Sequence, residues 1–121
     1  MPRFVLLEHR WNGVHWDFML ETGDVLRTWA VDAPIVAGET IPARSLPDHR
    51  KIYLDYQGEV SGQRGTVRRI DEGTYRPIVW AAGHVRVSVA GSQLVGEVDL
   101  CETGGNSGGL PSWSFRLGNL D

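Results

Sequence analysis

Residues 14–31 read VHWDFMLETGDVLRTWAV, which is two alternating segments joined by Thr22-Gly23-Asp24. Side chains two residues apart lie on the same face of a β-strand. The first segment therefore has two different faces, one formed by Trp16, Phe18 and Leu20 and the other by His15, Asp17, Met19 and Glu21. Because a short turn containing glycine separates the two segments, the stretch predicts a β-hairpin.

The rest of the chain repeats this pattern in short segments, among 15 glycines and 6 prolines. We expect further strands at residues 4–9, 51–56, 65–70, 74–80, 84–90, 93–100 and 113–117. Residues 32–48 hold three prolines and predict a loop or a short helical turn, and residues 103–109 (TGGNSGG) predict a flexible loop. The sequence thus predicts an all-β fold, a small closed or nearly closed β-barrel of about eight strands with short flanking helical turns.

The composition predicts one globular domain over residues 1–121. Hydrophobic residues make up 41% of the chain and charged residues 22%, as in ordinary folded domains. The single cysteine, Cys101, excludes an internal disulfide and favours a reducing, cytoplasmic compartment. No apolar run is long enough to cross a membrane, and Glu8, His9 and Arg10 interrupt any signal-peptide core. We therefore expect no membrane partner.

The net charge of −3 argues against a protein that coats nucleic acid by bulk electrostatics. It is compatible with a local cationic pocket. Eleven of the twelve cationic residues are arginine, and only Lys51 is lysine. This excess fits either a GC-rich coding bias or the use of arginine as a planar phosphate ligand.

His9, His15 and Asp17 are the candidate metal ligands. His15 and Asp17 share a strand face, about 7 Å apart along the strand, and His9 reaches the same face if the two neighbouring segments pair. Two imidazoles and one carboxylate suit Mn²⁺, Fe²⁺ or Zn²⁺ with open positions for water and substrate. A solvated strand face or a hydrogen-bonded pair explains the same spacing without a metal. Glu21 lies on this face, four residues beyond Asp17, and is expected at the rim of the site.

A second polar group lies at residues 47–53 (PDHRKIY). Its histidine, cations and tyrosine suit a phosphate, which they would bind by charge and hydrogen bonds. A polar loop leading into a strand is the alternative.

Several other residues carry weaker signals. Trp11 lies in the turn beside the candidate metal ligands, where it either stacks on a base or sugar or simply packs. His84 is expected at the surface, and Cys101 is expected to be an ordinary strand-end cysteine. Four tryptophans within strand patterns are expected to be buried or partly buried: Trp16, Trp29, Trp80 and Trp113.

Two blocks, residues 4–9 (FVLLEH) and 14–21 (VHWDFMLE), resemble the opening signature of the 3′-phosphoesterase domain of bacterial DNA ligase D. That signature reads roughly F-V-x-x-x-H followed by L-H-Y/W-D-F/L-R-L-E. Further blocks agree in the same order, at residues 25–31, 48–53, 65–67, 72–75, 94–96 and 113–117. The resemblance covers nearly the whole chain and implies a small β-barrel.

The resemblance also implies an activity. The family heals nucleic-acid 3′ ends in DNA repair, removing a 3′-terminal ribonucleoside and then the remaining 3′-phosphate with manganese. It implies that His9, His15 and Asp17 hold Mn²⁺, with Zn²⁺ or Co²⁺ as other possible ions, and that His49 and Tyr53 are catalytic. Nucleic-acid 3′ ends are the implied partner, with a repair ligase or polymerase acting in trans in non-homologous end joining.

One position departs from the family pattern. The family has an arginine two residues after the metal-binding Asp, and here that position is Met19, which cannot bind a phosphate. Arg50 and Arg44 are the expected phosphate ligands, and Arg27 is a further candidate to replace the missing arginine. Met19 keeps an alternative open, in which the chain is a weak or inactive module that binds a metal and phosphate and recognises nucleic-acid ends or a protein partner.

Overall fold

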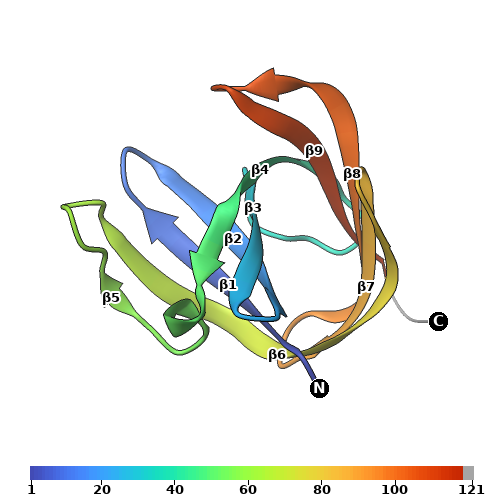
Figure 1. Cartoon of the computed structure of the whole chain (residues 1–121), viewed down its shortest axis with the longest axis horizontal. Coiled ribbons are helices and arrows are strands. Elements are labelled where there is room, and N and C mark those ends of the chain that lie inside the picture. Colours follow the sequence, from blue (N-terminus) through green and yellow to red (C-terminus); the bar gives the residue numbers. More distant parts are fainter. Residues whose placement is uncertain (119–121) are drawn as a thin grey trace.

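An antiparallel β-barrel forms the body of the molecule in the computed structural model, which describes residues 1–118 (Figure 1). Within these residues the elements are β1 (Arg3–Arg10), β2 (Val14–Thr22), β3 (Val25–Val31), β4 (Thr40–Arg50), the 3₁₀-helix η1 (Lys51–Leu54), β5 (Gly58–Glu59), β6 (Thr66–Ala81), β7 (His84–Gly91), β8 (Val95–Ser107) and β9 (Leu110–Gly118). The strands pair in the order β1-β2-β3-β4-β9-β8-β7-β6, and a β1–β6 pairing closes the ring. The prediction of a closed all-β barrel with about eight strands is therefore confirmed. No helix in residues 1–118 is long and apolar enough to cross a membrane.

The predicted hairpin is present as β2 and β3, with Trp16 opposite Val31 and Phe18 opposite Trp29. The alternation of the sequence sorts the side chains of β1 and β2 between two hydrophobic clusters on opposite faces of the sheet. The barrel interior holds Phe4, Leu6, Phe18, Leu20, Trp29 and Phe115 with twelve other buried residues. The outer cluster is smaller and consists of Val5, Leu7, Met19, Leu26, Leu54, Val60 and Val67, with Tyr53 packed against it.

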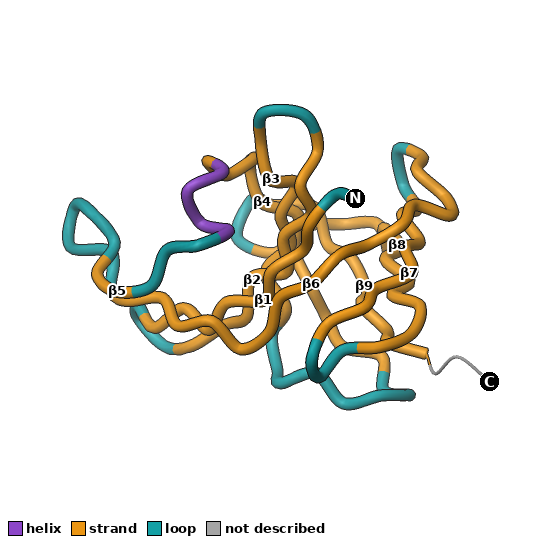
Figure 2. The backbone as a smooth tube through the Cα atoms, turned by 90° about the horizontal axis from the view of Figure 1, so that it is seen from below, coloured by secondary structure: helices purple, strands orange, loops and turns teal. Residues whose placement is uncertain are grey.

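The outer cluster lies under η1 and the segment around β5, which Figure 2 shows as an arm beside the barrel. Residues 51–56 were expected to form a strand, and that prediction was wrong, because residues 51–54 form η1. Ile52 is 52% exposed, whereas Leu54 is buried in the outer cluster. One buried anchor suits a single helical turn, while a strand of the barrel buries alternate residues.

The prediction of a loop or helical turn at residues 32–48 was wrong from Thr40 onward, where β4 begins. Its pairing with β3 shifts register, since Leu26 lies opposite His49 and Thr28 lies opposite Leu46. Pro47 falls within this irregularity. Proline lacks an N–H group and is tolerated at a bulge, so it does not end the strand.

The glycine-rich residues 103–109 also differ from the predicted loop, because β8 continues to Ser107 and pairs with β9. The pairing shifts register between Glu102 and Asn106, and Gly104 and Gly105 have positive φ angles there. This geometry is a bulged hairpin end, for which glycine is the favoured residue. Of the tryptophans, Trp29 and Trp113 are buried and Trp16 is partly buried, but Trp80 is 47% exposed, against expectation.

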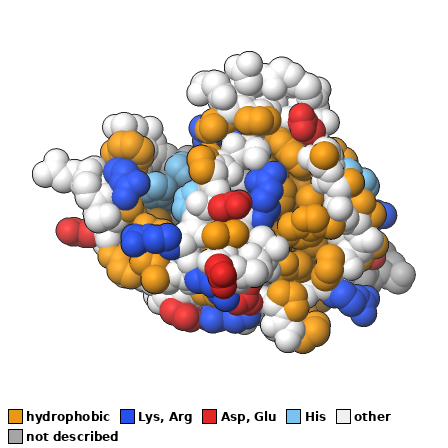
Figure 3. All heavy atoms as spheres, in the orientation of Figure 1, with side chains coloured by type: hydrophobic (Ala, Val, Ile, Leu, Met, Phe, Trp, Pro, Cys, Tyr) orange, Lys and Arg blue, Asp and Glu red, His pale blue; other side chains and the backbone are white. Residues whose placement is uncertain are grey.

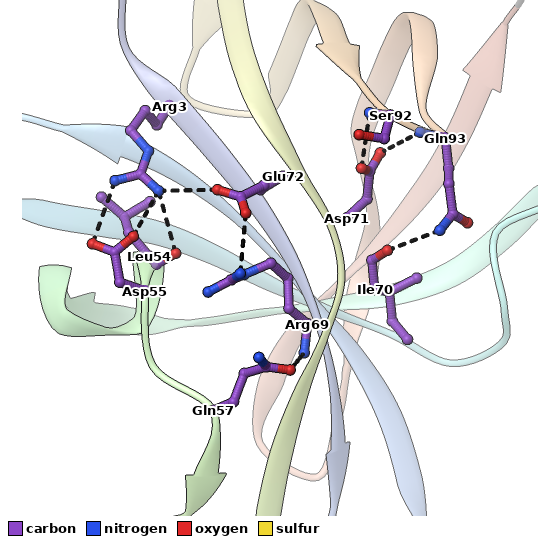
Figure 4. Close-up of polar contacts among 10 residues, drawn as sticks. All are labelled: Arg3, Leu54, Asp55, Gln57, Arg69, Ile70, Asp71, Glu72, Ser92 and Gln93. Atoms are coloured by element: carbon purple, nitrogen blue, oxygen red, sulfur yellow. Dashed lines mark hydrogen bonds and ion pairs between the residues drawn. The ribbon is translucent and has the colours of Figure 1, made fainter.

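The two strands expected at residues 65–70 and 74–80 form one continuous strand, β6, which passes through the turn-like residues Asp71-Glu72-Gly73. The buried carboxylate of Asp71 accepts hydrogen bonds from the backbone N–H groups of Ser92, Gln93 and Leu94, at 2.9, 3.0 and 2.7 Å, and Figure 4 shows the first two of these bonds. Asp71 therefore lies within a strand and stabilises the connection between β7 and β8, whereas the sequence suggested that it forms a turn between two strands.

The Asp71 carboxylate leaves no space beside Gly91 of β7. A Cβ atom at Gly91 would lie 2.3 Å from Asp71 Oδ2 and 2.7 Å from the ring of Phe4. Gly91 pairs with Gly73 of β6, and Gly73 also pairs with Phe4 of β1. Three strands thus meet closely at this point, where β6 passes from its pairing with β1 to its pairing with β7.

We expect Asp71→Ala to lower the free energy of unfolding by about 2–4 kcal/mol, because three backbone N–H groups, of which that of Leu94 is buried, lose a charged acceptor. Urea denaturation followed by tryptophan fluorescence measures the change. Ser92→Ala is the control, since it keeps the backbone donor and should stay within about 0.5 kcal/mol of the wild type. An Asp71→Ala protein as stable as the Ser92→Ala protein would contradict this account.

Candidate metal and phosphate site

Strands β1 and β2 place three possible metal ligands on the outer face of the barrel. His9 lies directly opposite His15 in the antiparallel register, and Asp17 lies opposite Leu7. His9 Nδ1 lies 3.3 Å from His15 Nε2 and 3.6 Å from Asp17 Oδ2. Ligand atoms of the three residues all lie within 4.8 Å of one another. The pairing thus brings together the three residues that the sequence singled out.

Asp17 is the buried member of this group, with a side chain 3% exposed. Burial opposes ionisation of the carboxyl group, but the imidazoles of His15 and His9 more than offset it and lower the pKa of Asp17 below its usual value. His15 Nε2 lies 3.0 Å from Asp17 Oδ1 without hydrogen-bond geometry, and this oxygen has no hydrogen-bond partner in residues 1–118. A buried carboxylate oxygen without a partner is costly, and a bound cation would satisfy it.

A backbone carbonyl orients the ring of His9. His9 Nε2 lies 2.8 Å from the carbonyl oxygen of Arg64. In the neutral tautomer with the proton on Nε2, this nitrogen donates to the carbonyl, and the lone pair of Nδ1 faces His15 and Asp17. Such an outer hydrogen bond is typical of metal-binding histidines. The residues present therefore fit a divalent cation.

Gly65 allows the Arg64 carbonyl to reach His9. Its φ angle is +80°, and a Cβ atom there would lie 1.8 Å from the carbonyl oxygen of Arg10 and 2.7 Å from Trp11. Only glycine allows the chain to pass this close to the end of β1.

The metal-ligand group opens into a cavity of about 510 Å³. His49, at the end of β4, and Tyr53, in η1, line the same cavity, and their rings lie 5.9 Å apart. His49 Nδ1 lies 2.9 Å from the carbonyl oxygen of Pro47. If Nδ1 carries the proton, it donates to that carbonyl and leaves Nε2 for a ligand. Trp11 also lines the cavity, 46% exposed, with its ring stacked against His9 at 6.3 Å.

Figure 3 shows histidine side chains in a hollow of this face, beside the tip of the β1–β2 hairpin. The cavity lies on the outside of the barrel, because Met19 and Val67 line it and belong to the outer cluster. The packed barrel interior takes no part in it.

Polar contacts fix η1 and the chain that follows it against the barrel. Lys51 Nζ lies 2.9 Å from Glu21 Oε2, so Glu21 anchors η1 and is not among the metal-ligand group. The Arg3 guanidinium pairs with Asp55 at 2.9 Å and with Glu72 at 3.2 Å, as Figure 4 shows. These pairs hold the segment that carries Tyr53 in place.

A second anchor lies further along the same segment, where the side chain of Gln57 accepts a hydrogen bond from the backbone N–H of Arg69 at 2.9 Å (Figure 4). Together with the burial of Leu54, it ties the connection from η1 to β5 onto β6.

The cavity wall carries three arginines, Arg44, Arg50 and Arg64. Arg44 pairs with Asp32 at 3.5 Å. Sequence reasoning proposed Arg44 and Arg50 but missed Arg64, whose only signal was its place before the Gly65-Thr66-Val67 block. Met19 lies in the cavity wall and is 1% exposed, so this position offers a thioether in place of a charge.

Arg27 lies elsewhere. Its guanidinium stacks on Trp29 at 4.0 Å and approaches Trp113 at 5.6 Å, and both tryptophans belong to the barrel interior. Burial lowers the pKa of Arg27. Arg27 is therefore on the opposite face of the sheet from the cavity and does not replace the arginine missing at Met19.

Comparison with known proteins assigns the chain to a family. Residues 7–102 match the family model of the DNA ligase D 3′-phosphoesterase domain, and the chain belongs to this family. The chain is 30% identical over 112 residues to the multifunctional non-homologous end joining DNA repair protein LigD of Mycobacterium tuberculosis and to the LigD protein of Mycobacterium bovis. The aligned segment covers 85% of this chain but only 15% of each relative.

We expect the protein to bind one Mn²⁺ through His9, His15 and Asp17, and His15→Ala or Asp17→Asn to weaken that binding at least tenfold. Equilibrium dialysis with metal analysis measures this change. His49→Ala is the matched control, because it removes an imidazole from the same cavity but not from the ligand group. Equal Mn²⁺ affinity in the wild type and His15→Ala would refute the assignment.

Proposed function

We propose that the chain is a metal-dependent 3′-phosphoesterase, a phosphodiesterase and phosphomonoesterase that heals nucleic-acid 3′ ends in DNA repair. The observation that carries the proposal is the convergence of His9, His15 and Asp17 with His49 and Tyr53 on one cavity. Family membership supports the reaction class. His9, His15 and Asp17 would hold a divalent cation, Mn²⁺ in this proposal with Zn²⁺ and Co²⁺ as other candidates, which would polarise a phosphoryl oxygen and lower the pKa of a water.

The remaining side chains act on the phosphate and the leaving group. His49 lines the cavity with its Nδ1 near the Pro47 carbonyl, and in this proposal Nε2 is the atom that donates a proton to the departing oxygen. The Tyr53 hydroxyl donates a hydrogen bond to a phosphoryl oxygen that gains charge in the transition state. Arg44 and Arg50 bind the phosphate from the cavity wall.

The substrate in this proposal is a strand end and not duplex nucleic acid along its length. The net charge of −3 provides no bulk attraction for a polyanion, whereas the arginines of the cavity wall suit a single phosphate. Trp11 offers an exposed ring on which the terminal base or sugar can stack. We also propose a cytoplasmic role in non-homologous end joining alongside a repair ligase or polymerase in trans, as the names of the mycobacterial relatives suggest.

The second candidate function is a weak or inactive module that binds a metal and phosphate and recognises nucleic-acid ends or a protein partner. One observation favours it. Met19 lines the cavity two residues after Asp17, where the family pattern has an arginine. Its buried thioether carries no charge and cannot stabilise a phosphoryl oxygen.

Activity on a primer-template with a 3′-phosphate separates the two candidates. We expect Mn²⁺-dependent release of phosphate, with kcat lowered about 10²- to 10⁴-fold in His49→Ala through loss of proton transfer. Tyr53→Phe keeps the ring but loses the hydroxyl, and should show a smaller loss. Tyr56→Phe, a nearby tyrosine outside the metal cavity, is the control. Binding of the 3′ end without turnover under any divalent metal would favour the binding module.

Met19→Arg tests the incomplete phosphate site. We expect kcat to rise about tenfold or more, because a guanidinium at this position reaches the phosphate. Met19→Leu is the matched control, since it conserves volume without charge, and melting temperatures check that both variants fold. Unchanged kcat in a folded Met19→Arg protein would show that the other arginines already suffice.

A further inference from the structure

A second group of metal-ligand side chains lies on the outward face of β7 and β8. His84 lies directly opposite Cys101 in the antiparallel pair, and Asp99 lies two residues before Cys101 on the same face of β8. Val85, Val87, Val98 and Leu100, the alternate residues, point into the barrel interior. Figures 1 and 2 place β7 and β8 on the side of the barrel away from β5, so this group is separate from the cavity described above.

The three side chains converge. His84 Nε2 lies 2.6 Å from Asp99 Oδ1, and Cys101 Sγ lies 3.9 Å from Asp99 Oδ2. One ligand atom from each residue lies within 4.8 Å of the others. Ligands around a tetrahedral Zn²⁺ are separated by roughly 3.5 Å, given metal–ligand distances of about 2.0–2.3 Å. Small rotamer changes therefore suffice to place all three around one ion.

The charges around this group suit a divalent cation. With Cys101 as thiolate and Asp99 ionised, the group carries two negative charges, which a divalent ion neutralises. The neighbouring cation Arg86 pairs with Glu97 at 3.3 Å. Burial and the Asp99 charge raise the pKa of Cys101, so without a cation the sulfur keeps its proton.

We propose that His84, Asp99 and Cys101 form a second metal site, selective for Zn²⁺ and similar borderline ions, with water as the fourth ligand. The chemistry of the ligands separates it from the first site, because thiolate prefers Zn²⁺ over Mn²⁺ whereas a carboxylate and two imidazoles accept Mn²⁺. Binding replaces the His84–Asp99 hydrogen bond by two metal bonds, as the neutral imidazole of His84 moves its proton from Nε2 to Nδ1, and releases the thiol proton of Cys101 to solvent. The bound ion then links β7 to β8.

Co²⁺ titration of the full chain tests this site, because only a sulfur ligand gives the intense near-ultraviolet thiolate-to-cobalt charge-transfer band. We expect the band in the wild type and in His15→Ala, which disables the first site. The band should be lost in Cys101→Ser, and Co²⁺ affinity read from it should fall about tenfold or more in His84→Ala and Asp99→Asn. Ser88→Ala, on the same outward face of β7, is the control and should match the wild type.

A second readout follows the reactivity of Cys101. We expect saturating Zn²⁺ to slow alkylation of Cys101 at least tenfold in the wild type and in His15→Ala, but not in His84→Ala. Absence of the charge-transfer band in the wild type would overturn the proposal. So would a band of unchanged affinity in His84→Ala and Asp99→Asn, which would reveal a lone thiol taking up cobalt. Neither result bears on phosphoesterase activity, which is measured separately at the first site.

Discussion

The carboxylate of Asp71 holds together the point on which the barrel depends. It accepts hydrogen bonds from three backbone N–H groups that follow β7. Asp71 itself lies in β6, which pairs first with β1 and then with β7. These hydrogen bonds attach the β7–β8 connection to the middle of β6, where the strand changes its pairing partner from β1 to β7. The β1–β6 pairing closes the ring of strands at the same place. The absence of side chains at Gly73 and Gly91 is the steric counterpart of the same constraint.

Strands β1 and β2 of the closed barrel, which carry the candidate metal ligands, are packed on both faces. Their inner residues fill the barrel, and their outer residues form a second apolar cluster that η1 and β5 cover. The candidate metal ligands lie on the same outer face, where the His9–His15 pair follows the Leu7–Asp17 pair toward the tip of the hairpin. The packing and pairing of β1 and β2 therefore fix the positions of these three side chains. The opposite wall of the cavity is built differently, from the end of β4 and from η1, and ion pairs such as Lys51–Glu21 hold it in position.

Sequence patterns predicted those parts of the molecule that depend on local periodicity. Alternation at residues 14–21 identified the hairpin and assigned His15 and Asp17 to one face. It failed where a long-range contact overrides local chemistry: Asp71 looks like a turn residue but accepts hydrogen bonds from a distant connection, and Pro47 looks like a strand breaker but lies in a bulge. The contact from the Arg64 carbonyl to His9 had no signal at all, because a backbone carbonyl is common to every residue type. Arg27 was placed wrongly among the phosphate candidates because the sequence does not reveal which face of β3 meets the cavity.

The contact between the Arg64 carbonyl and His9 has a consequence for sequence variation at Gly65. The atom that orients His9 belongs to the backbone, so a change of side chain at position 64 would alter the cavity wall but not the contact that orients the imidazole. The neighbouring position has no such freedom, since any side chain there would meet the end of β1. If His9 serves a metal, glycine should be retained at position 65 among related sequences although it has no functional group. A search for conserved residues confined to polar side chains would overlook this position.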